Sequence, residues 1–333
     1  MKEHKAVTAL LNTAKQQKRC AYGTNRAERM ALRRRLQADE LICPYKGIYV
    51  EKTYWSNLSR EEQSQHTIRT LARRHPNWVF TGISAACIYN VEHSYALHDG
   101  TVYIASSGGI NGQDEPHLQR IYMQRIPVRK YRGMNVTSPE RMLIDCTSLP
   151  FAQSLAIYDS ALRNNLITTN AVQSLALQCV CDEAAVSKLL KYANPLSENG
   201  GESFARGTIL ERHFAIPLLQ VEFNNPNHPE SPYRVDFLWK LADGRIIVAE
   251  YDGTAKYADA SNANRASIRA KLEYERNRER HLKDQKVTVI VHLFYEDVVQ
   301  PWRLEKKLRE AGVPQALNFA MAPTLTQTIS TVA

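Results

Sequence analysis

The chain has 333 residues, 44% of them hydrophobic and 23% charged, with 14 glycines and 14 prolines, which excludes fibrous and wholly disordered proteins and suggests two or three domains. A formal net charge of +9 favours a polyanionic partner, with nucleic acid as the leading class. No apolar run has the length of a membrane helix, and no secretion signal opens the chain, so we expect a cytoplasmic protein.

Residues 1–75 follow the order helix, turn, basic helix and hairpin. Apolar residues recur at helical spacing in "KAVTALLNTAKQQ", and Thr24 or Asn25 can cap a second helix. "ICPYKGIYVEK" then alternates around a Lys-Gly turn, as a hairpin does. This order predicts a winged helix-turn-helix that binds double-stranded DNA, although an arginine-rich helix can also be merely a solvated face. The candidate DNA contacts are Arg26, Arg29, Arg33 and Lys46.

Residues 76–195 are expected to form an α/β connector domain. "PNWVFTGISAACIYNV" predicts a strand and a helix, "TVYIASS" and "RIYMQRIPV" predict strands, and a helix should begin after Ser138 with Pro139 in its first turn. Nothing in this segment has catalytic spacing, and His93 and His98 look isolated along the chain. The six cysteines show no C-x-x-C spacing, so we expect neither a zinc site nor a disulfide framework.

Residues 196–315 change to the order α-β-β-β-α-β. The break falls at "NPLSENGG"; a helix is expected in "ESFARGTILERHF" and strands in "LLQVEF", "YRVDFLW" and "RIIVAEYDG". A long charged helix from about residue 262 to 283, a strand in "VTVIVHLFY" and a helix in "PWRLEKKLRE" complete the pattern. Residues 316–333 have little to anchor them and are expected to be a flexible tail.

Carboxylates stand at the ends of two neighbouring predicted strands. Asp236 ends one of them, and Glu250 and Asp252, which share a face because the strand period is two, end the next. Oxygen ligands gathered at one sheet edge suit Mg²⁺ or Mn²⁺. Lys256 follows shortly after and can orient a water or stabilise charge on a phosphate.

Two families resemble parts of this sequence. "GGESFAR", "YRVDF", "VAEYDGTAKY" and "ERNRERHL…VTVIV" together resemble the Vsr-like branch of the PD-(D/E)XK nuclease superfamily, over roughly residues 198–311. "TALLNTAK…KGIYV", "GISAACIYNV" and "NVTSPERMLIDCTSL" are similar to abortive-infection antitoxin-like proteins of type IV toxin-antitoxin systems, whose N-terminal winged helix binds DNA. The resemblance implies a winged helix-turn-helix, an α/β middle segment and a restriction-endonuclease-like α/β domain.

The nuclease resemblance also implies residue roles. Glu202 matches the acidic residue of the first core helix, Asp236 the metal ligand of the second strand and Glu250 the acid of the third. The superfamily's lysine two positions after that acid is absent, because Asp252 occupies its place, and Lys256 is a candidate substitute.

The long charged helix carries further candidates. Arg278 and Glu279 match the "RE" of related domains. Arg265, Arg269, Arg276 and Arg280 can contact phosphates, although charges on a long helix are often a solvated face.

Two hypotheses follow. In the first, the protein is a Mg²⁺- or Mn²⁺-dependent endonuclease that docks on duplex DNA, with metal ligands from Asp236, Glu250 and Asp252. In the second, it is a DNA-binding regulator or antitoxin-like protein whose nuclease fold is catalytically degenerate, with a toxin as partner. A homodimer fits both, since winged-helix proteins often dimerise.

Overall fold

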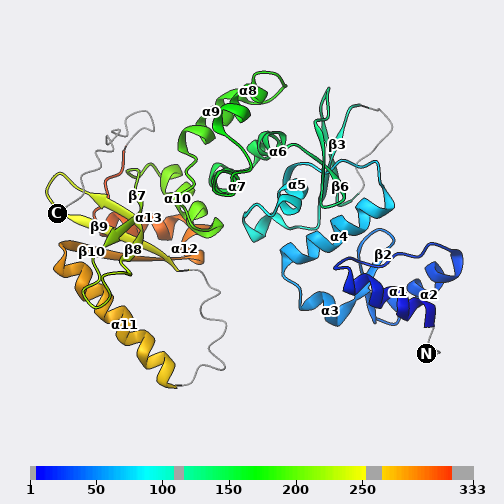
Figure 1. Ribbon diagram of the computed structural model, residues 1–333, viewed down its shortest axis with the longest axis horizontal. Coiled ribbons are helices and arrows are strands. Elements are labelled where there is room, and N and C mark those ends of the chain that lie inside the picture. Colours follow the sequence, from blue (N-terminus) through cyan, green and yellow to red (C-terminus); the bar gives the residue numbers. More distant parts are fainter. Residues whose placement is uncertain (1–4, 109–115, 253–264, 317–333) are drawn as a thin grey trace. The chain divides into compact units, whose positions relative to one another are not determined.

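The computed structural model describes residues 5–108, 116–252 and 265–316, without the side chains of 265–272. The chain divides into two compact units, Met1–Pro195 and Leu196–Ala333 (Figure 1). Both mix helices with small sheets, which confirms the expected mixed α/β class. No helix among the described residues is long and apolar enough to cross a membrane. Lys256 and residues 317–333 lie outside the described residues.

The first unit begins with the predicted order of two helices and a hairpin. These elements are α1 (Lys5–Gln16), α2 (Arg26–Gln37), β1 (Leu41–Tyr45) and β2 (Ile48–Glu51). Asn25, rather than Thr24, caps α2 by accepting the backbone N–H of Glu28 at 2.9 Å. The hairpin turns at Lys46 and Gly47, whose φ of +75° is accessible to glycine.

The connection between α1 and α2 is longer than a helix-turn-helix turn of three or four residues. It spans residues 17–25, and within it Ala21 forms an isolated antiparallel bridge with Tyr49 of β2. The element order therefore agrees with the sequence prediction, whereas the winged-helix assignment itself stays a proposal.

The rest of the first unit is a set of helices beside two-stranded ribbons. Its elements are α3 (Lys52–Ser56), α4 (Arg60–Arg74), α5 (Gly82–Tyr89), η1 (Tyr95–Leu97), β3 (Val102–Ser106), β4 (Leu118–Tyr122), β5 (Val128–Tyr131), β6 (Met134–Thr137), α6 (Pro139–Asp145), η2 (Cys146–Ser148), α7 (Phe151–Arg163), α8 (Thr169–Ala176) and α9 (Glu183–Tyr192). Ser138 caps α6 and Pro139 occupies its first turn, as predicted. The strand expected before α5 is reduced to isolated bridges made by Phe80.

The second unit has the predicted α-β-β-β-α-β order, with one additional short helix. Its elements are α10 (Gly200–Glu211), β7 (Leu218–Phe223), β8 (Tyr233–Lys240), β9 (Ile246–Asp252), α11 (Arg265–Asp284), β10 (Val287–Phe294), α12 (Tyr295–Val299) and α13 (Pro301–Glu310). The strand order is β10-β9-β8-β7, with β9 and β10 parallel across α11 and the other neighbours antiparallel.

Helices cover both faces of this sheet because its central strands are apolar on both sides. On one face, Ile209 of α10 and Leu304 of α13 pack in a core with Phe237 and Ala249. On the other face, Leu282 of α11 packs with residues that include Val235 and Val248. Each fully buried side chain of this size contributes about 1.5–3 kcal/mol, so the two cores fix the position of the strand ends.

Candidate functional site

The central sheet of the second unit splits into a fork. Strands β8 and β9 pair from Lys240↔Ile246 to Phe237↔Ala249, and the pairing ends there. Beyond that point β8 stays paired with β7, and β9 stays paired with β10. We call the divergence of β8 and β9 beyond Phe237↔Ala249 "the fork".

Asp236 lies at the base of the fork. Its Oδ2 accepts the backbone N–H of Tyr251 at 2.8 Å. This bond replaces a backbone hydrogen bond between the two strands. The separation of β8 from β9 would otherwise leave the Tyr251 N–H without a partner, and the Asp236 side chain supplies one. The sequence prediction placed Asp236 and Glu250 on neighbouring strands, as the structure does, but it put Asp236 at a strand end. Asp236 instead lies in the middle of β8, one residue beyond the last pair that β8 makes with β9.

Gln220 of β7 joins two of the predicted carboxylates. Its Nε2 donates to Glu202 Oε2 at 2.9 Å and to Asp236 Oδ1 at 3.2 Å. Its φ is +51°, an uncommon conformation for a non-glycine residue. The distortion also reverses the facing of β7, because Leu219 packs in the core beside α10 whereas Val221 packs on the α11 side. Sequence reasoning missed Gln220, since nothing in "LLQVEF" signals a break.

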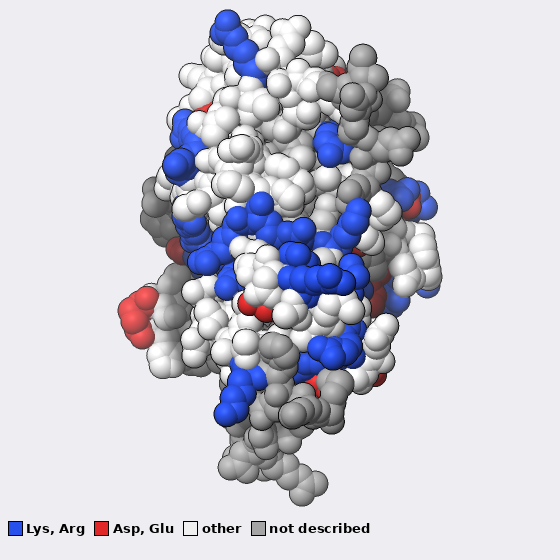
Figure 2. All heavy atoms as spheres, turned by 90° about the vertical axis from the view of Figure 1, so that its right-hand side faces the viewer, with Lys and Arg blue, Asp and Glu red and all other residues white. Residues whose placement is uncertain are grey.

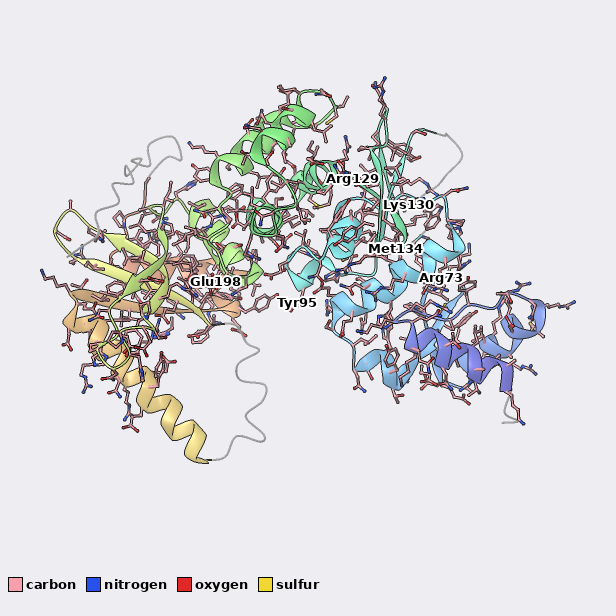
Figure 3. The ribbon with its side chains drawn as sticks, viewed as in Figure 1. Arg73, Tyr95, Arg129, Lys130, Met134 and Glu198 are labelled. Atoms are coloured by element: carbon pink, nitrogen blue, oxygen red, sulfur yellow. The ribbon has the colours of Figure 1, made fainter. Side chains whose placement is uncertain are left out.

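Glu202 is held at the start of α10. Asn199 caps this helix and also donates its amide to Glu202 Oε1 at 2.6 Å, while the backbone N–H of Glu198 donates to Oε2 at 2.7 Å. Glu198 is labelled in Figure 3. The Glu202 side chain is almost fully buried, at 4% exposure. A buried carboxylate with three donors is a positioned group rather than a surface charge.

The carboxyl groups at the fork repel one another. Burial and the charge of Asp236 raise the pKa of Glu202 to about 7. Burial and the charge of Glu250 raise the pKa of Asp236, against the lowering effect of the Tyr251 N–H. Carboxyl groups held together with raised pKa values are typical of sites that bind a cation or move a proton.

Glu250 is engaged by a single arginine of α11. Arg278 Nη1 donates to Glu250 Oε2 at 2.6 Å, Nη2 lies 2.6 Å from Oε1, and Nη2 also donates to the carbonyl of Arg234 at 2.9 Å. Burial lowers the pKa of Arg278, but the hydrogen bond and charge of Glu250 outweigh it and leave the pKa above its ordinary value. The guanidinium thus joins α11 to both prongs of the fork.

Asp252 points to the same side of the sheet as Glu250 and pairs with a histidine. His292 Nδ1 lies 3.2 Å from Asp252 Oδ2, and His292 Nε2 lies 3.7 Å from Glu279 Oε1. The hydrogen bond to Asp252 raises the pKa of His292. No local pattern in the sequence pointed to His292, because this residue reaches Asp252 only through the parallel pairing of β10 with β9.

The start of α10 packs directly on Tyr251 of β9. A Cβ added at Gly201 would lie 2.4 Å from Cε1 of Tyr251, so the aromatic ring occupies the space of a side chain there. Only glycine allows α10 to approach the residue whose N–H binds Asp236.

The net positive charge of the chain comes from its first 75 residues. Residues 1–75 contain 16 lysines and arginines against 7 aspartates and glutamates, whereas residues 76–333 contain 27 of each kind. The entire net charge of +9 therefore belongs to the first 75 residues. Figure 2, which faces the first unit, shows lysines and arginines gathered in a band with few acidic groups.

Arg26, Arg29 and Arg33 are exposed on α2, opposite the buried Ala31 and Leu32. Lys46 is exposed at the tip of the hairpin. Three further exposed basic residues are Arg73 at the end of α4 and Arg129 and Lys130 on β5 (Figure 3). Arg265 and Arg269 belong to α11, but their side chains lie outside the described residues.

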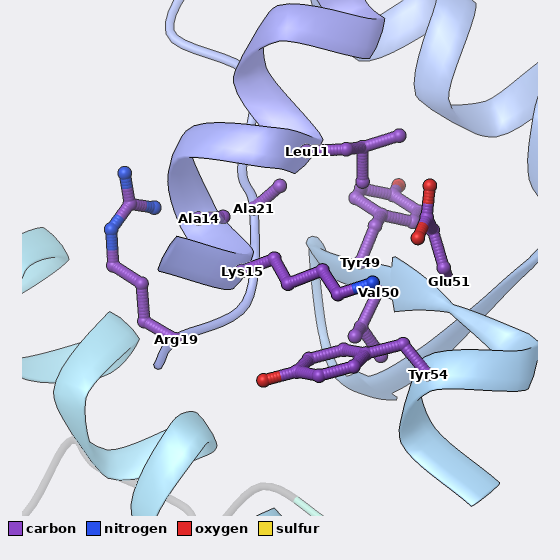
Figure 4. A pocket seen from close by; sticks show the side chains of 9 residues that line it. All are labelled: Leu11, Ala14, Lys15, Arg19, Ala21, Tyr49, Val50, Glu51 and Tyr54. Carbon is purple, nitrogen blue, oxygen red and sulfur yellow. The ribbon is translucent and has the colours of Figure 1, made fainter. Parts of the chain in front are cut away.

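A small pocket lies between α1 and β2 (Figure 4). Lys15 crosses it and places its Nζ 4.8 Å from the centroid of the Tyr54 ring. Because the lysine stem and the ring fill the opening, we interpret this pocket as packing rather than as a ligand site.

No family model, curated protein or solved structure matches this chain. The geometry of the chain itself therefore carries the functional argument.

Replacement of Arg278 by alanine should lower the free energy of unfolding by about 3 kcal/mol, because it leaves the largely buried Glu250 without its partner. Arg278→Lys should recover only part of this loss, since an ammonium cannot reproduce the bonds that the guanidinium makes to both Glu250 and the carbonyl of Arg234. Urea denaturation measures both variants. Arg280→Ala, an exposed position two residues on, is the control, and an equal effect of the two alanine variants would contradict the role of the pair.

Glu202 should make the protein less stable as pH rises. Its folded pKa of about 7 lies above the ordinary 4.5, so its protonated form favours the folded state and that contribution is lost between about pH 4.5 and 7. Relative to Glu202→Gln, the wild type should lose on the order of 2–3 kcal/mol across this window. Urea denaturation at several pH values measures the difference, with the exposed Glu222→Gln as control; parallel curves for wild type and Glu202→Gln would refute the shift.

Proposed function

We propose that this protein binds double-stranded DNA through its first 75 residues and hydrolyses phosphodiester bonds at a divalent-metal site in the fork. The observation that carries the proposal is that Glu202 and Asp236, from two different elements, share the amide of Gln220 and have raised pKa values, and that the charge of Glu250 on β9 contributes to the raised pKa of Asp236. Buried carboxyl groups with raised pKa values are typical of sites that bind a cation or share a proton.

The donor set fits a hard divalent cation, Mg²⁺ or Mn²⁺. Asp236 and Glu250 would hold it, with Glu202 beside Asp236. Glu250 Oε1 accepts no well-aligned hydrogen bond from the described residues, but the Arg278 guanidinium lies 2.6 Å from it, so a cation would bind there in competition with Arg278. The amide nitrogen of Gln220 stands between Glu202 and Asp236, where positive charge is most favourable. Asp252 is engaged by His292 and is the weaker candidate ligand.

A bound divalent ion polarises the scissile phosphate and lowers the pKa of its water. Among the chain's own groups, Glu202 can accept a proton near neutral pH because of its raised pKa of about 7. Arg278 orients the carboxylate of Glu250. Lys256 belongs to the proposal as the group that stabilises charge on the phosphate, in place of the lysine that Asp252 replaces.

The exposed arginines of α2 and Lys46 support docking on duplex DNA. A helix with basic residues at spacings of three and four presents them along one face, which can follow the phosphates of a groove. Because the whole net charge of +9 belongs to residues 1–75, this region attracts a polyanion and the fork does not.

A second candidate function is a DNA-binding regulator, antitoxin-like, in which the fork is structural. This candidate is favoured because the carboxylates of the fork already have protein partners. Arg278 binds Glu250, and Gln220 donates to both Glu202 and Asp236. A toxin or a second copy of the chain would then be the protein partner.

The nuclease proposal predicts DNA cleavage that needs both a metal and Asp236. The purified protein is incubated with plasmid, linear duplex and mismatched duplex DNA in Mg²⁺, Mn²⁺ or EDTA. Asp236→Asn, which keeps the shape of the side chain, should lower the cleavage rate about 100-fold or more. Asp243→Asn, at the exposed turn between β8 and β9, is the matched control and should cut like the wild type.

Two outcomes decide between the candidates. Cuts that need metal and vanish only in Asp236→Asn would support the nuclease. If wild type and Asp236→Asn bind DNA equally and neither cuts any of the three substrates, the regulator is favoured.

The docking proposal predicts that Arg26→Ala/Arg33→Ala weakens DNA binding and lowers the slope of log K against log salt by about 2, since two phosphate contacts are lost. Arg29 is left intact because it packs on Gly23 and donates to the Thr24 carbonyl. Lys188→Ala/Lys191→Ala on α9 removes the same charge elsewhere. Fluorescence anisotropy across a salt series measures both, and identical slopes for the two double variants would overturn this interface.

A further inference from the structure

A second cluster of potential metal ligands lies in the first unit, far along the chain from the fork. Cys87 is on α5, His93 follows the end of that helix, and His98 follows η1. Their ligand atoms all lie within 4.8 Å of one another. Among the described residues, no other group of three or more His, Cys, Asp or Glu side chains brings its ligand atoms this close together. Spacing along the chain gives no sign of it, which is why the two histidines looked isolated in the sequence.

The histidine tautomers suit metal ligation. His93 Nδ1 lies 2.6 Å from the carbonyl oxygen of Val91, which can only accept, so Nδ1 carries the proton and Nε2 keeps its lone pair. That Nε2 is the atom facing Cys87 Sγ, at 3.8 Å. A backbone carbonyl that orients the ring in this way is a regular feature of histidine ligands.

His98 presents its other nitrogen to the same point. Its Nδ1 lies 3.9 Å from Cys87 Sγ and 3.0 Å from Ser64 Oγ, and the side chain is buried. The two imidazole rings have centroids 4.7 Å apart. Burial lowers the pKa of both histidines, so both rings are neutral at physiological pH, which is the form that binds a metal.

The two sulfur-to-nitrogen distances are close to those of a tetrahedral zinc site. Zn–S of about 2.3 Å and Zn–N of about 2.0–2.1 Å at tetrahedral angles separate sulfur from nitrogen by about 3.6 Å. The two sulfur-to-nitrogen distances of 3.8 and 3.9 Å exceed this by only a few tenths of an ångström. One thiolate with two imidazoles also matches zinc in ligand softness.

Helix α4 can complete the site. Glu61 is half-buried and lies three residues before Ser64, so both are on one face of α4, and the charge of Glu61 acts on the Cys87 thiol. Zinc with one thiolate and two neutral histidines keeps one positive charge, which a buried setting disfavours. The Glu61 carboxylate is near enough to act on Cys87 electrostatically, so it is the candidate counter-charge for such an ion.

We propose that Cys87, His93 and His98 bind one zinc ion, which fastens the segment after α5 to that helix. The ion would be separate from the Mg²⁺ or Mn²⁺ of the fork in ligands and in purpose, because it ties together chain segments and is not part of the proposed hydrolysis. Binding displaces the thiol proton of Cys87, so affinity should rise with pH.

The test uses the full chain, incubated with Zn²⁺, desalted and analysed for metal by mass spectrometry. Wild type and Asp236→Asn should each retain about one zinc per chain, while Cys87→Ala and His93→Gln should retain little. Cys146→Ala removes another buried thiol of the same unit and should retain zinc like the wild type.

A measurement on the wild type alone keeps the test independent of variant folding. Co²⁺ added to the metal-free chain should give the absorption of sulfur-to-cobalt charge transfer, and Zn²⁺ should abolish that absorption and raise the melting temperature. No retained zinc together with no cobalt–sulfur absorption would overturn the proposal. Zinc lost in Asp236→Asn but kept in Cys87→Ala would overturn it as well, by placing the ion in the fork.

Discussion

The bond from the Tyr251 N–H to Asp236 is the contact on which the candidate site depends. It allows β8 and β9 to separate without leaving a buried donor unpaired, and so it opens the sheet at the place where the carboxylates converge. The cost of holding Asp236 there appears as a raised pKa. Gly201 belongs to the same arrangement, since any side chain at that position would collide with Tyr251.

Two hydrogen-bond donors, one neutral and one charged, hold the carboxylates of the fork. Gln220 brings an amide nitrogen between Glu202 and Asp236, and Arg278 brings a guanidinium to Glu250. The amide is neutral and leaves the pKa of Glu202 near 7, whereas the guanidinium carries a full charge. A divalent ion would therefore relieve more repulsion beside Glu202 and Asp236 than beside Glu250.

The two units differ in net charge. All of the net positive charge lies in residues 1–75, while the second unit contains 18 basic and 18 acidic residues. A neutral unit with a buried carboxylate cluster has no long-range attraction for a polyanion, so DNA would have to be brought by the basic region. The Cys87, His93 and His98 cluster is compatible with this division, because a metal there would stiffen the basic unit without adding to its proposed DNA-binding surface.

The sequence by itself determined the order of elements in the second unit and the placement of Asp236 and Glu250 on neighbouring strands, because strand periodicity and apolar runs are local properties. It put Asp236 at a strand end, whereas Asp236 lies in the middle of β8, where pairing with β9 stops. It also located the cap of α6 at Ser138. Only the tertiary structure decided that Gln220 joins Glu202 to Asp236, that His292 meets Asp252, and that Cys87 meets two histidines. These groups meet through a distorted strand, a parallel pairing across α11 and a turn after α5, and such long-range contacts leave no periodic trace in the chain.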